Sequence, residues 1–356
     1  MIENLKIIDK SNSVKKRIDW VDIAKGLGIL CVLFGHFQIN MNMPNCKVDI
    51  NNYLINSFHM PLFFFLSGYC FSKKPVSFGK FFMKKFAGLM IPYIFFSVIW
   101  IIYETIVNYI STKSFNFEFL FLEVKMYILQ IRLHAIWFLP CMFVLELVFF
   151  FIQKISKDNL IVISVITIAV TVFGYYYRTH YNGNLPWNID VIGTMLFFFG
   201  FGYVLKSMAL NRNLSKVKRI GVFLLFAVIN LAANYINTYY FEANASVSGN
   251  NYGNFILYYI SALFGTFAII ELSKLLEGRT KFVKYIGANT LVYFGLHQII
   301  YYFSKSFILS RLDLSYVGLW IAYIIIMIVS IVILTAFNEL LIKTKLKVVL
   351  GKGLVK

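Results

Sequence analysis

The sequence predicts an all-α bundle of about ten transmembrane helices, with both termini in the cytoplasm. Hydrophobic residues make up 59% of the 356-residue chain and charged residues only 14%, a balance that no soluble chain of this length could bury. The apolar residues also gather in runs long enough to cross about 30 Å of hydrocarbon. These runs fit helices better than barrel strands, which alternate over about ten residues. We interpret 1–356 as a single transmembrane domain with basic cytoplasmic tails at 1–19 and 342–356.

The predicted spans follow one another along the chain with polar loops between them. They lie near residues 20–39, 54–71, 88–110, 136–153, 160–177, 188–205, 219–239, 254–276, 286–304 and 316–341. The first is expected to be retained as a span, because it lacks the small-residue cleavage site of a signal peptide. The longest outer segment, 111–135, mixes Phe, Glu and Lys and is compatible with an interfacial amphipathic helix.

The distribution of basic residues predicts the orientation. Of the 34 Lys and Arg residues, 26 fall in the tails and alternate loops on one side, seven on the other side, and Lys25 within the first span. Because cytoplasmic loops carry the excess of Lys and Arg, both termini are expected inside. The net charge of +18 is spread over every inner loop rather than gathered in one patch, so we expect no nucleic-acid partner.

The four cysteines are expected to be packing residues. Cys31, Cys46, Cys70 and Cys141 show neither CxxC nor metal-ligand spacing, so no metal site is predicted from them.

Two residues of the first span are the most informative pair in the chain. Lys25 and His36 stand eleven residues apart, which is roughly 16 Å along a helix and about half the hydrocarbon thickness. One helix therefore carries a cation near the inner face and an imidazole deep in the membrane. Polar side chains at such depth are costly, which makes both functional candidates. The alternative for Lys25 is a local ion pair with Asp22.

Three of the five histidines are predicted to share one outer-half layer of the membrane. They are His36 on span one, His59 on span two and His297 on span nine, whereas His134 and His180 are expected at the outer surface. Burial disfavours the charged imidazolium, so a histidine in this layer is expected to be neutral and able to act as a general base. A hydrogen-bonded packing role remains the alternative for each, least so for His36.

The residues around this pair resemble the acyltransferase-3 family, integral-membrane O-acyltransferases of surface polysaccharides. The stretch from Arg17 through Lys25-Gly26 to Gly35-His36 is similar to its first-span signature, in which a basic residue precedes a histidine by eleven positions. Later landmarks agree in order, and the second-span motif resembles the fucose 4-O-acetylase-like branch. They are Phe58 to Tyr69, Lys84-Lys85 with Ile91-Pro92-Tyr93, Trp137-Phe138-Leu139, and Ile286 to Thr290 with His297.

The resemblance implies transfer of an acyl group, expected to be acetyl, from cytosolic acyl-CoA to a hydroxyl of a surface or secreted polysaccharide or its lipid-linked precursor. His36 is then the expected catalytic base, with Lys25 and His297 as further catalytic candidates. CoA is expected to contact Lys25, Lys84, Lys85 and Ser67. One departure is that the family often has arginines where this chain has Lys84 and Lys85, and lysine cannot form a bidentate fork to phosphate. Topology determination is an equal alternative for these two lysines.

Further expectations concern the acceptor and the location. His59, Asn289, Tyr293 and Trp137 are expected to bind substrate, although aromatic residues at span ends also form the ordinary interfacial belt. Acyl-CoA is expected as donor substrate, with no bound cofactor and no metal. The lipid bilayer, specifically the plasma membrane, is the expected location of this multi-pass protein.

Three other classes of protein remain open from the sequence. A polysaccharide or lipid-linked glycan transporter or flippase without transferase chemistry also has ten or more spans, although no internal repeat is visible here. A membrane zinc enzyme could use three layered histidines, yet the chain has no HExxH or other tight ligand pair. The unrelated membrane-bound O-acyltransferases also use an intramembrane histidine, and only the first-span motif argues against them.

Overall fold

The computed structural model describes residues 17–41, 54–73, 76–181, 183–208, 214–243 and 245–354. In these ranges the chain forms helices joined by loops, which confirms the all-α class, and one isolated antiparallel bridge pairs Ser246 with Asn251. The helices are α1 (Asp19–Met41), α3 (His59–Cys70), α4 (Phe78–Lys85), α5 (Ile91–Thr112), α6 (Phe117–Leu129), α7 (Phe138–Ile155), α8 (Leu160–His180), α9 (Ile189–Ser207), α10 (Lys216–Tyr240), α11 (Phe255–Leu275), α12 (Lys281–Ala288), α13 (Thr290–Phe303) and α14 (Tyr316–Lys343).

Seven helices in the described ranges are long and apolar enough to cross a membrane. They match predicted spans three to eight and ten, with α4 and α5 joined through a π-helical turn at Phe86–Met90. The other three predicted spans are the ones that carry His36, His59 and His297. There α1 has acidic residues in its first turn, α3 is only 12 residues long, and span nine is divided into α12 and α13. The prediction of ten membrane-crossing helices is thus met for seven.

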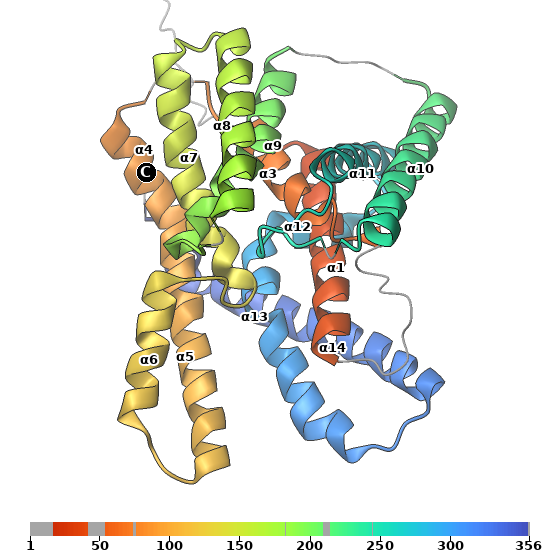
Figure 1. Ribbon diagram of the computed structural model, residues 1–356. Coiled ribbons are helices and arrows are strands. Elements are labelled where there is room, and N and C mark those ends of the chain that lie inside the picture. Colours follow the sequence, from red (N-terminus) through yellow and green to blue (C-terminus); the bar gives the residue numbers. More distant parts are fainter. Residues whose placement is uncertain are drawn as a thin grey trace, which may run out of the picture.

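The helix α1 lies in the middle of the bundle. It packs against α3, α11, α12 and α13 (Figure 1). Around this centre, the most apolar stretches of α7 and α9 are each 67% buried, whereas that of α14 is only 17% buried. A helix that is apolar all round and exposed to this extent is expected to face lipid. The histidine-bearing helices therefore lie in the interior of the bundle. A helix in this position does not have to present a long apolar surface to lipid.

Glycines set the distance between the central helices. A Cβ atom added to Gly287 of α12 would lie 1.6 Å from the carbonyl oxygen of Asp22 on α1, and one added to Gly68 of α3 would lie 1.8 Å from that of Phe199 on α9. No side chain fits such a gap, and small residues at helix interfaces permit this close backbone approach. The contact at Gly287 fixes α12 against the first turns of α1, where Lys25 is located.

We expect Gly287→Ala to destabilise the fold by about 3 kcal/mol, because the backbone atoms that its methyl group meets cannot rotate away. The measurement is the thermal midpoint and the monodisperse fraction of the purified protein in detergent. Gly221→Ala on α10 is the matched control, since nothing lies within 4 Å of its added Cβ. Equal stability of the two variants would contradict the close packing of α1 and α12.

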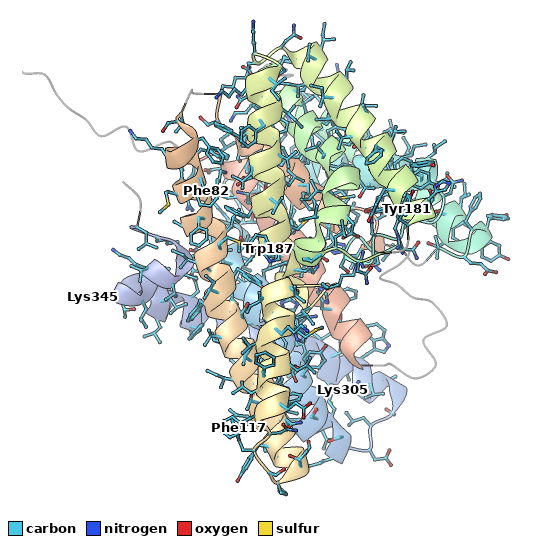
Figure 2. The ribbon with its side chains drawn as sticks, turned by 60° about the vertical axis from the view of Figure 1, so that its left-hand side comes forward. Phe82, Phe117, Tyr181, Trp187, Lys305 and Lys345 are labelled. Carbon is cyan, nitrogen blue, oxygen red and sulfur yellow. The ribbon has the colours of Figure 1, made fainter. Side chains whose placement is uncertain are left out.

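Within the segment 111–135, α6 forms the second arm of a helical hairpin. Asn116 caps α6 by accepting a hydrogen bond from the backbone N–H of Phe119, and α6 then runs back beside α5. Figure 1 shows the pair extending away from α7 and α8, and Figure 2 shows Phe117 at its far end. Phe117 and Phe121 are 78% and 72% exposed. Exposed aromatic rings at the end of a hairpin are compatible with a membrane–water interface, and the interfacial location of this segment stays a prediction.

Candidate functional site

The first part of the site is a cavity of about 510 Å³ beside the first turns of α1. Its polar lining is dominated by cations from three parts of the chain, which are the start of α1, the end of α9 and the segment after α14. The lining residues are Arg17, Ile18, Val21, Asp22, Lys25, Cys70, Lys206, Gly287, Ala288, Asn289, Thr290, Leu291, Asn338, Leu350 and Lys352. With four basic side chains against one carboxylate, this basic cavity favours an anionic ligand.

Two of these cations show how the basic cavity is built. Lys352 lies beyond the end of α14, and its Nζ donates a hydrogen bond to Asn289 Oδ1 at 3.1 Å. Burial, and to a lesser degree the neighbouring Arg17, lowers the pKa of Lys352. A bound anion would oppose that shift, because it favours the charged form of a buried ammonium group. Lys206 comes from the last turn of α9.

The ion pair between Lys25 and Asp22, the alternative that the sequence left open, is not found among the described residues. Asp22 has its Oδ2 3.8 Å from Arg17 Nη1, and among the described residues no carboxylate is placed within 4.0 Å of the Lys25 ammonium group. The side chain of Lys25 is half-buried and lines the basic cavity. Its charge is thus available to a ligand.

A second, narrow cavity continues along α1 from the first. It has a volume of about 40 Å³ and an almost wholly apolar wall. The wall consists of Ile29, Phe63, Phe138, Leu139, Thr290, Leu291 and Phe294. Thr290 and Leu291 also line the basic cavity, so the two spaces adjoin.

The third cavity holds the histidines and has a volume of about 90 Å³. It shares Phe294 with the narrow apolar cavity. Its walls come from α1, the start of α3, the turn just before α7, the loop between α10 and α11, and α13. They are Cys31, Val32, Gly35, His36, Ile55, Asn56, His59, Met60, Ala135, Trp137, Ala245, Ser246, Val247, Ser248 and Phe294. The basic cavity, the narrow apolar cavity and this histidine cavity therefore follow one another along α1.

The predicted layer of three histidines is a real cluster in space. The ring of His36 is centred 5.1 Å from that of His297 on α13, and Gln298 Nε2 lies 3.1 Å from His36 Nδ1. His59 lines the histidine cavity together with His36. His297 is fully buried behind them. Among the described residues, no three His, Cys, Asp or Glu side chains form a group that could hold a metal ion.

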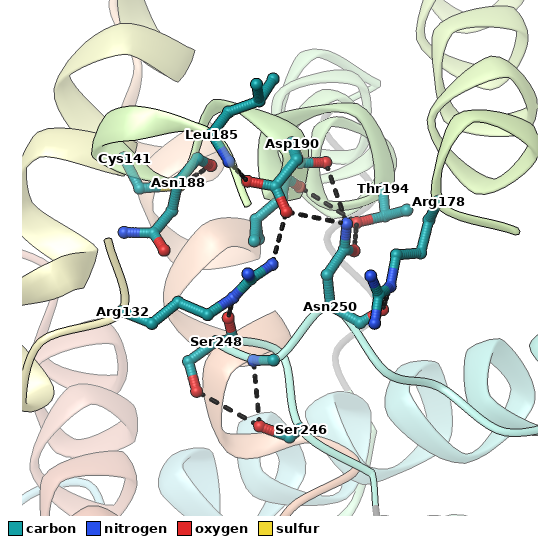
Figure 3. A network of polar contacts seen from close by, with 12 residues as sticks. Arg132, Cys141, Arg178, Leu185, Asn188, Asp190, Thr194, Ser246, Ser248 and Asn250 are labelled. Atoms are coloured by element: carbon teal, nitrogen blue, oxygen red, sulfur yellow. Dashed lines mark hydrogen bonds and ion pairs between the residues drawn. The ribbon is translucent and has the colours of Figure 1, made fainter. Parts of the chain in front are cut away.

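A polar network holds the loop that closes the histidine cavity. Arg132 Nη2 donates to Asp190 Oδ2 at 2.6 Å, and Arg132 Nε donates to the carbonyl oxygen of Ser248. Asn250 Nδ2 donates to Asp190 Oδ2 at 3.2 Å, and Arg178 Nε donates to the carbonyl of Asn250 at 2.9 Å (Figure 3). Asp190 is 6% exposed, so this is a buried and satisfied ion pair. The network fixes residues 245–248 as a wall of the cavity.

The structure brings several predicted site residues together and places others elsewhere. Lys25 and Asn289 share the basic cavity, and His36, His59 and Trp137 share the histidine cavity. Tyr293 is instead hydrogen-bonded to Thr335 of α14 at 2.7 Å.

The predicted CoA contacts of α3 and α4 lie outside the basic cavity. Lys85 Nζ donates to Glu146 Oε1 on α7 at 2.7 Å, and Lys84 is exposed. Cys70 lines the basic cavity, but Ser67, one turn earlier on α3, does not.

Sequence reasoning missed residues that act through tertiary contacts. Arg17, Lys206 and Lys352 belong to the basic tails and loops that were explained by topology alone, although their position at helix ends was a usable signal. Gln298 follows His297 directly, but a neutral amide in an apolar run gives no signal of its partner. The wall formed by residues 245–248 has no sequence signal at all.

A family model described as an acyltransferase domain, that of the acyltransferase-3 family, matches residues 18–338. The match includes α1 and all residues that line the histidine cavity, while Arg17 and Lys352 of the basic cavity lie outside it. No match was found among curated proteins or among solved structures. The matched region covers most of the chain, from the first helix into α14. The chain therefore belongs to the acyltransferase-3 family of membrane acyltransferases.

Proposed function

We propose that this protein is an O-acyltransferase that moves an acyl group, expected to be acetyl, from cytosolic acyl-CoA to a hydroxyl of a surface or secreted polysaccharide or its lipid-linked precursor. The observation that carries the proposal is the order of the three cavities along α1. A basic space, a narrow apolar space and a histidine space follow one another. That order suits an anionic donor that binds in the basic cavity and extends its reactive end to a proton acceptor in the histidine cavity.

The basic cavity suits the charged end of acyl-CoA. A volume of about 510 Å³ is typical of small-molecule sites, and its four cations match the phosphates of the donor. Lys25 and Lys206 reach this space from helices, and Asn289 adds a hydrogen-bonding side chain. Lys84, Lys85 and Ser67 lie elsewhere, so we retain Lys25 alone of the predicted CoA contacts.

The narrow apolar cavity suits the uncharged arm that links the phosphates to the thioester. Its wall offers aromatic and aliphatic side chains and one hydroxyl, at Thr290. A thioester that passes this constriction is separated from bulk water. Exclusion of water favours transfer to the acceptor over hydrolysis.

The histidine cavity suits the transfer itself. The acceptor oxygen attacks the carbonyl carbon of the thioester, its proton passes to a histidine nitrogen, and the CoA thiolate leaves and recovers the proton. Holding hydroxyl, thioester and base in one small space supplies rate through orientation, and a positioned base contributes about 10²–10⁴-fold. Trp137 and residues 245–248 line this cavity, which supports a role for them in contacting the acceptor.

The proposed reaction takes its acyl-CoA donor from the cytosolic side of the plasma membrane. The start of α1 meets basic ends of other helices: Lys284 Nζ lies 2.7 Å from Asp19 Oδ1, and the Lys274 ammonium lies over the Trp20 ring. These lysines belong to loops that the charge distribution assigns to the cytoplasm. Both termini are accordingly proposed to be cytoplasmic, with the basic cavity open to cytosolic acyl-CoA.

The deciding experiment compares cells with and without this gene. Ester-linked acyl groups on the cell-surface glycans are released with alkaline hydroxylamine and identified by mass spectrometry. Membranes are also supplied with labelled acetyl-CoA, and label in the glycan fraction is counted. We expect both signals to require the gene. Loss of the glycan itself, with no change in acyl groups per sugar, would support a transporter or flippase instead.

A further inference from the structure

The amide of Gln298 has a fixed orientation between two parts of the histidine cavity. Its Oε1 accepts a hydrogen bond from the backbone N–H of Ala135 at 2.7 Å, and Gln298 is 5% exposed. A backbone N–H can only donate, so the oxygen of the amide must face Ala135. The amide nitrogen therefore faces His36 Nδ1, 3.1 Å away.

This orientation determines which nitrogen of His36 carries the proton. The NH2 group of an amide donates and cannot accept, so His36 Nδ1 must be the acceptor. A neutral imidazole has one N–H, and in His36 that N–H is consequently Nε2. Protonation at Nδ1 would set two donors against each other at 3.1 Å. Gln298 thus opposes the step that a general base in this position has to perform.

The other two histidines have the opposite arrangement. His59 Nδ1 lies 3.0 Å from the carbonyl oxygen of Ile55, and His297 Nδ1 lies 2.8 Å from that of Tyr293. Carbonyl oxygens only accept, so both rings carry the proton on Nδ1 and the lone pair on Nε2. His297 Nε2 is buried and has no hydrogen-bond partner among the described residues. His59, in contrast, lines the cavity that His36 lines.

We propose that His59 is the proton acceptor of the transfer, that His36 acts as a hydrogen-bond donor through Nε2–H, and that Gln298 is the positioning residue that fixes this division. The inference rests on the proposed acyl transfer. It replaces the base role that the sequence assigned to His36. His297 packs against the His36 ring and is too deeply buried to reach the acceptor.

In the resulting transfer step, every bond that forms is matched by one that breaks, and the proton is returned. The acceptor O–H proton passes to His59 Nε2 as the new C–O bond forms, and the carbonyl electron pair moves onto the carbonyl oxygen. His36 Nε2–H donates a hydrogen bond to that oxygen, as a donor in an oxyanion hole does. When the carbonyl re-forms, the C–S bond breaks, and the CoA thiolate takes the proton from His59. The products are the ester and free CoA.

The first test reads the tautomers without any substrate. Protein labelled with 15N-histidine is measured by NMR in lipid nanodiscs, and signals are assigned by single His36→Gln, His59→Gln and His297→Gln variants. We expect the proton of His36 on Nε2 and those of His59 and His297 on Nδ1. In Gln298→Glu, whose carboxylate accepts from both Ala135 and the ring, His36 is expected to switch to Nδ1–H. A His36 ring with its proton on Nδ1 in the unsubstituted protein overturns the inference.

The second test uses activity. Gln298→Glu should lower kcat by about 100-fold with little change in KM for acetyl-CoA, because the donor on Nε2 is lost. If His36 were the base, Gln298→Glu should instead raise kcat, because a carboxylate next to Nδ1 makes the imidazole a stronger base. Activity at or above the original level would therefore overturn the inference.

Substitution by glutamine separates the two histidines. His36→Gln keeps an N–H and should retain at least tenfold more activity than His36→Ala, whereas His59→Gln should be as inactive as His59→Ala. The opposite pattern returns the base role to His36. His180→Ala, an exposed histidine outside the cavities, is the control for substitution alone. If the unsubstituted protein transfers no acyl group, the proposed function fails while the tautomer measurement still decides the arrangement of the protons.

Discussion

Replacement of His36 by alanine is expected to lower acyl transfer by about two to four orders of magnitude, which is the usual contribution of a positioned proton-transfer group or oxyanion donor. The effect should fall on kcat. His36 lines the histidine cavity, whereas Lys25 of the basic cavity that is proposed to bind acyl-CoA lies roughly 16 Å away along α1, so KM for acetyl-CoA should change little. The measurement is initial-rate transfer of labelled acetyl groups by the purified protein in nanodiscs.

The control for this loss is a variant that removes a histidine without touching a cavity. His180→Ala suits this purpose, because His180 is exposed and stacks on Tyr176, one turn earlier in α8. Both variants should elute as monodisperse protein with the original thermal midpoint. Near-normal transfer by a correctly folded His36→Ala protein would remove His36 from the mechanism.

The spacing within α1 was enough to predict the two ends of the site. Lys25 and His36 are linked by one helix, so their separation follows from the rise per residue alone. The structure places them in separate cavities that follow one another along that helix. The common depth of His59 and His297 was also predictable, because it follows from the order and direction of the helices. Their convergence on His36 in fact required α3 and α13 to pack beside α1.

Contacts between side chains that are distant in the chain could not be predicted from the sequence. Lys84 and Lys85 are neighbours in the chain, but Lys85 is paired with Glu146 on α7, and nothing local to Lys85 indicates that partner. Gln298 could not be recognised either, since its role depends on the backbone N–H of Ala135, 163 residues away. Of the ten predicted membrane-crossing helices, seven are confirmed by length and composition among the described residues, and the three that carry histidines are not. Apolar runs in short interior helices resemble lipid-facing spans when packing partners are unknown.

Replacement of Lys25 by alanine is expected to raise KM for acetyl-CoA by roughly ten- to a hundredfold, since a hydrogen bond to a charged group contributes about 1.5–3 kcal/mol. Lys25 has no carboxylate placed within 4.0 Å among the described residues, so its loss leaves no partner unpaired in the protein. The matched control is Lys218→Ala, which removes the same charge from an exposed position on α10 outside the cavities. Its KM should be unchanged.

A donor with fewer phosphates makes the Lys25 test specific. If Lys25 contacts the 3′-phosphate of CoA, 3′-dephospho-acetyl-CoA should already lose that contact, and Lys25→Ala should then add little further loss. If Lys25 contacts the pyrophosphate instead, the two losses should add, because independent contacts contribute independently. The local ion-pair alternative predicts that Asp22→Asn restores activity to Lys25→Ala. We expect no recovery, because the carboxylate of Asp22 faces Arg17 rather than Lys25, and recovery would assign Lys25 a structural role.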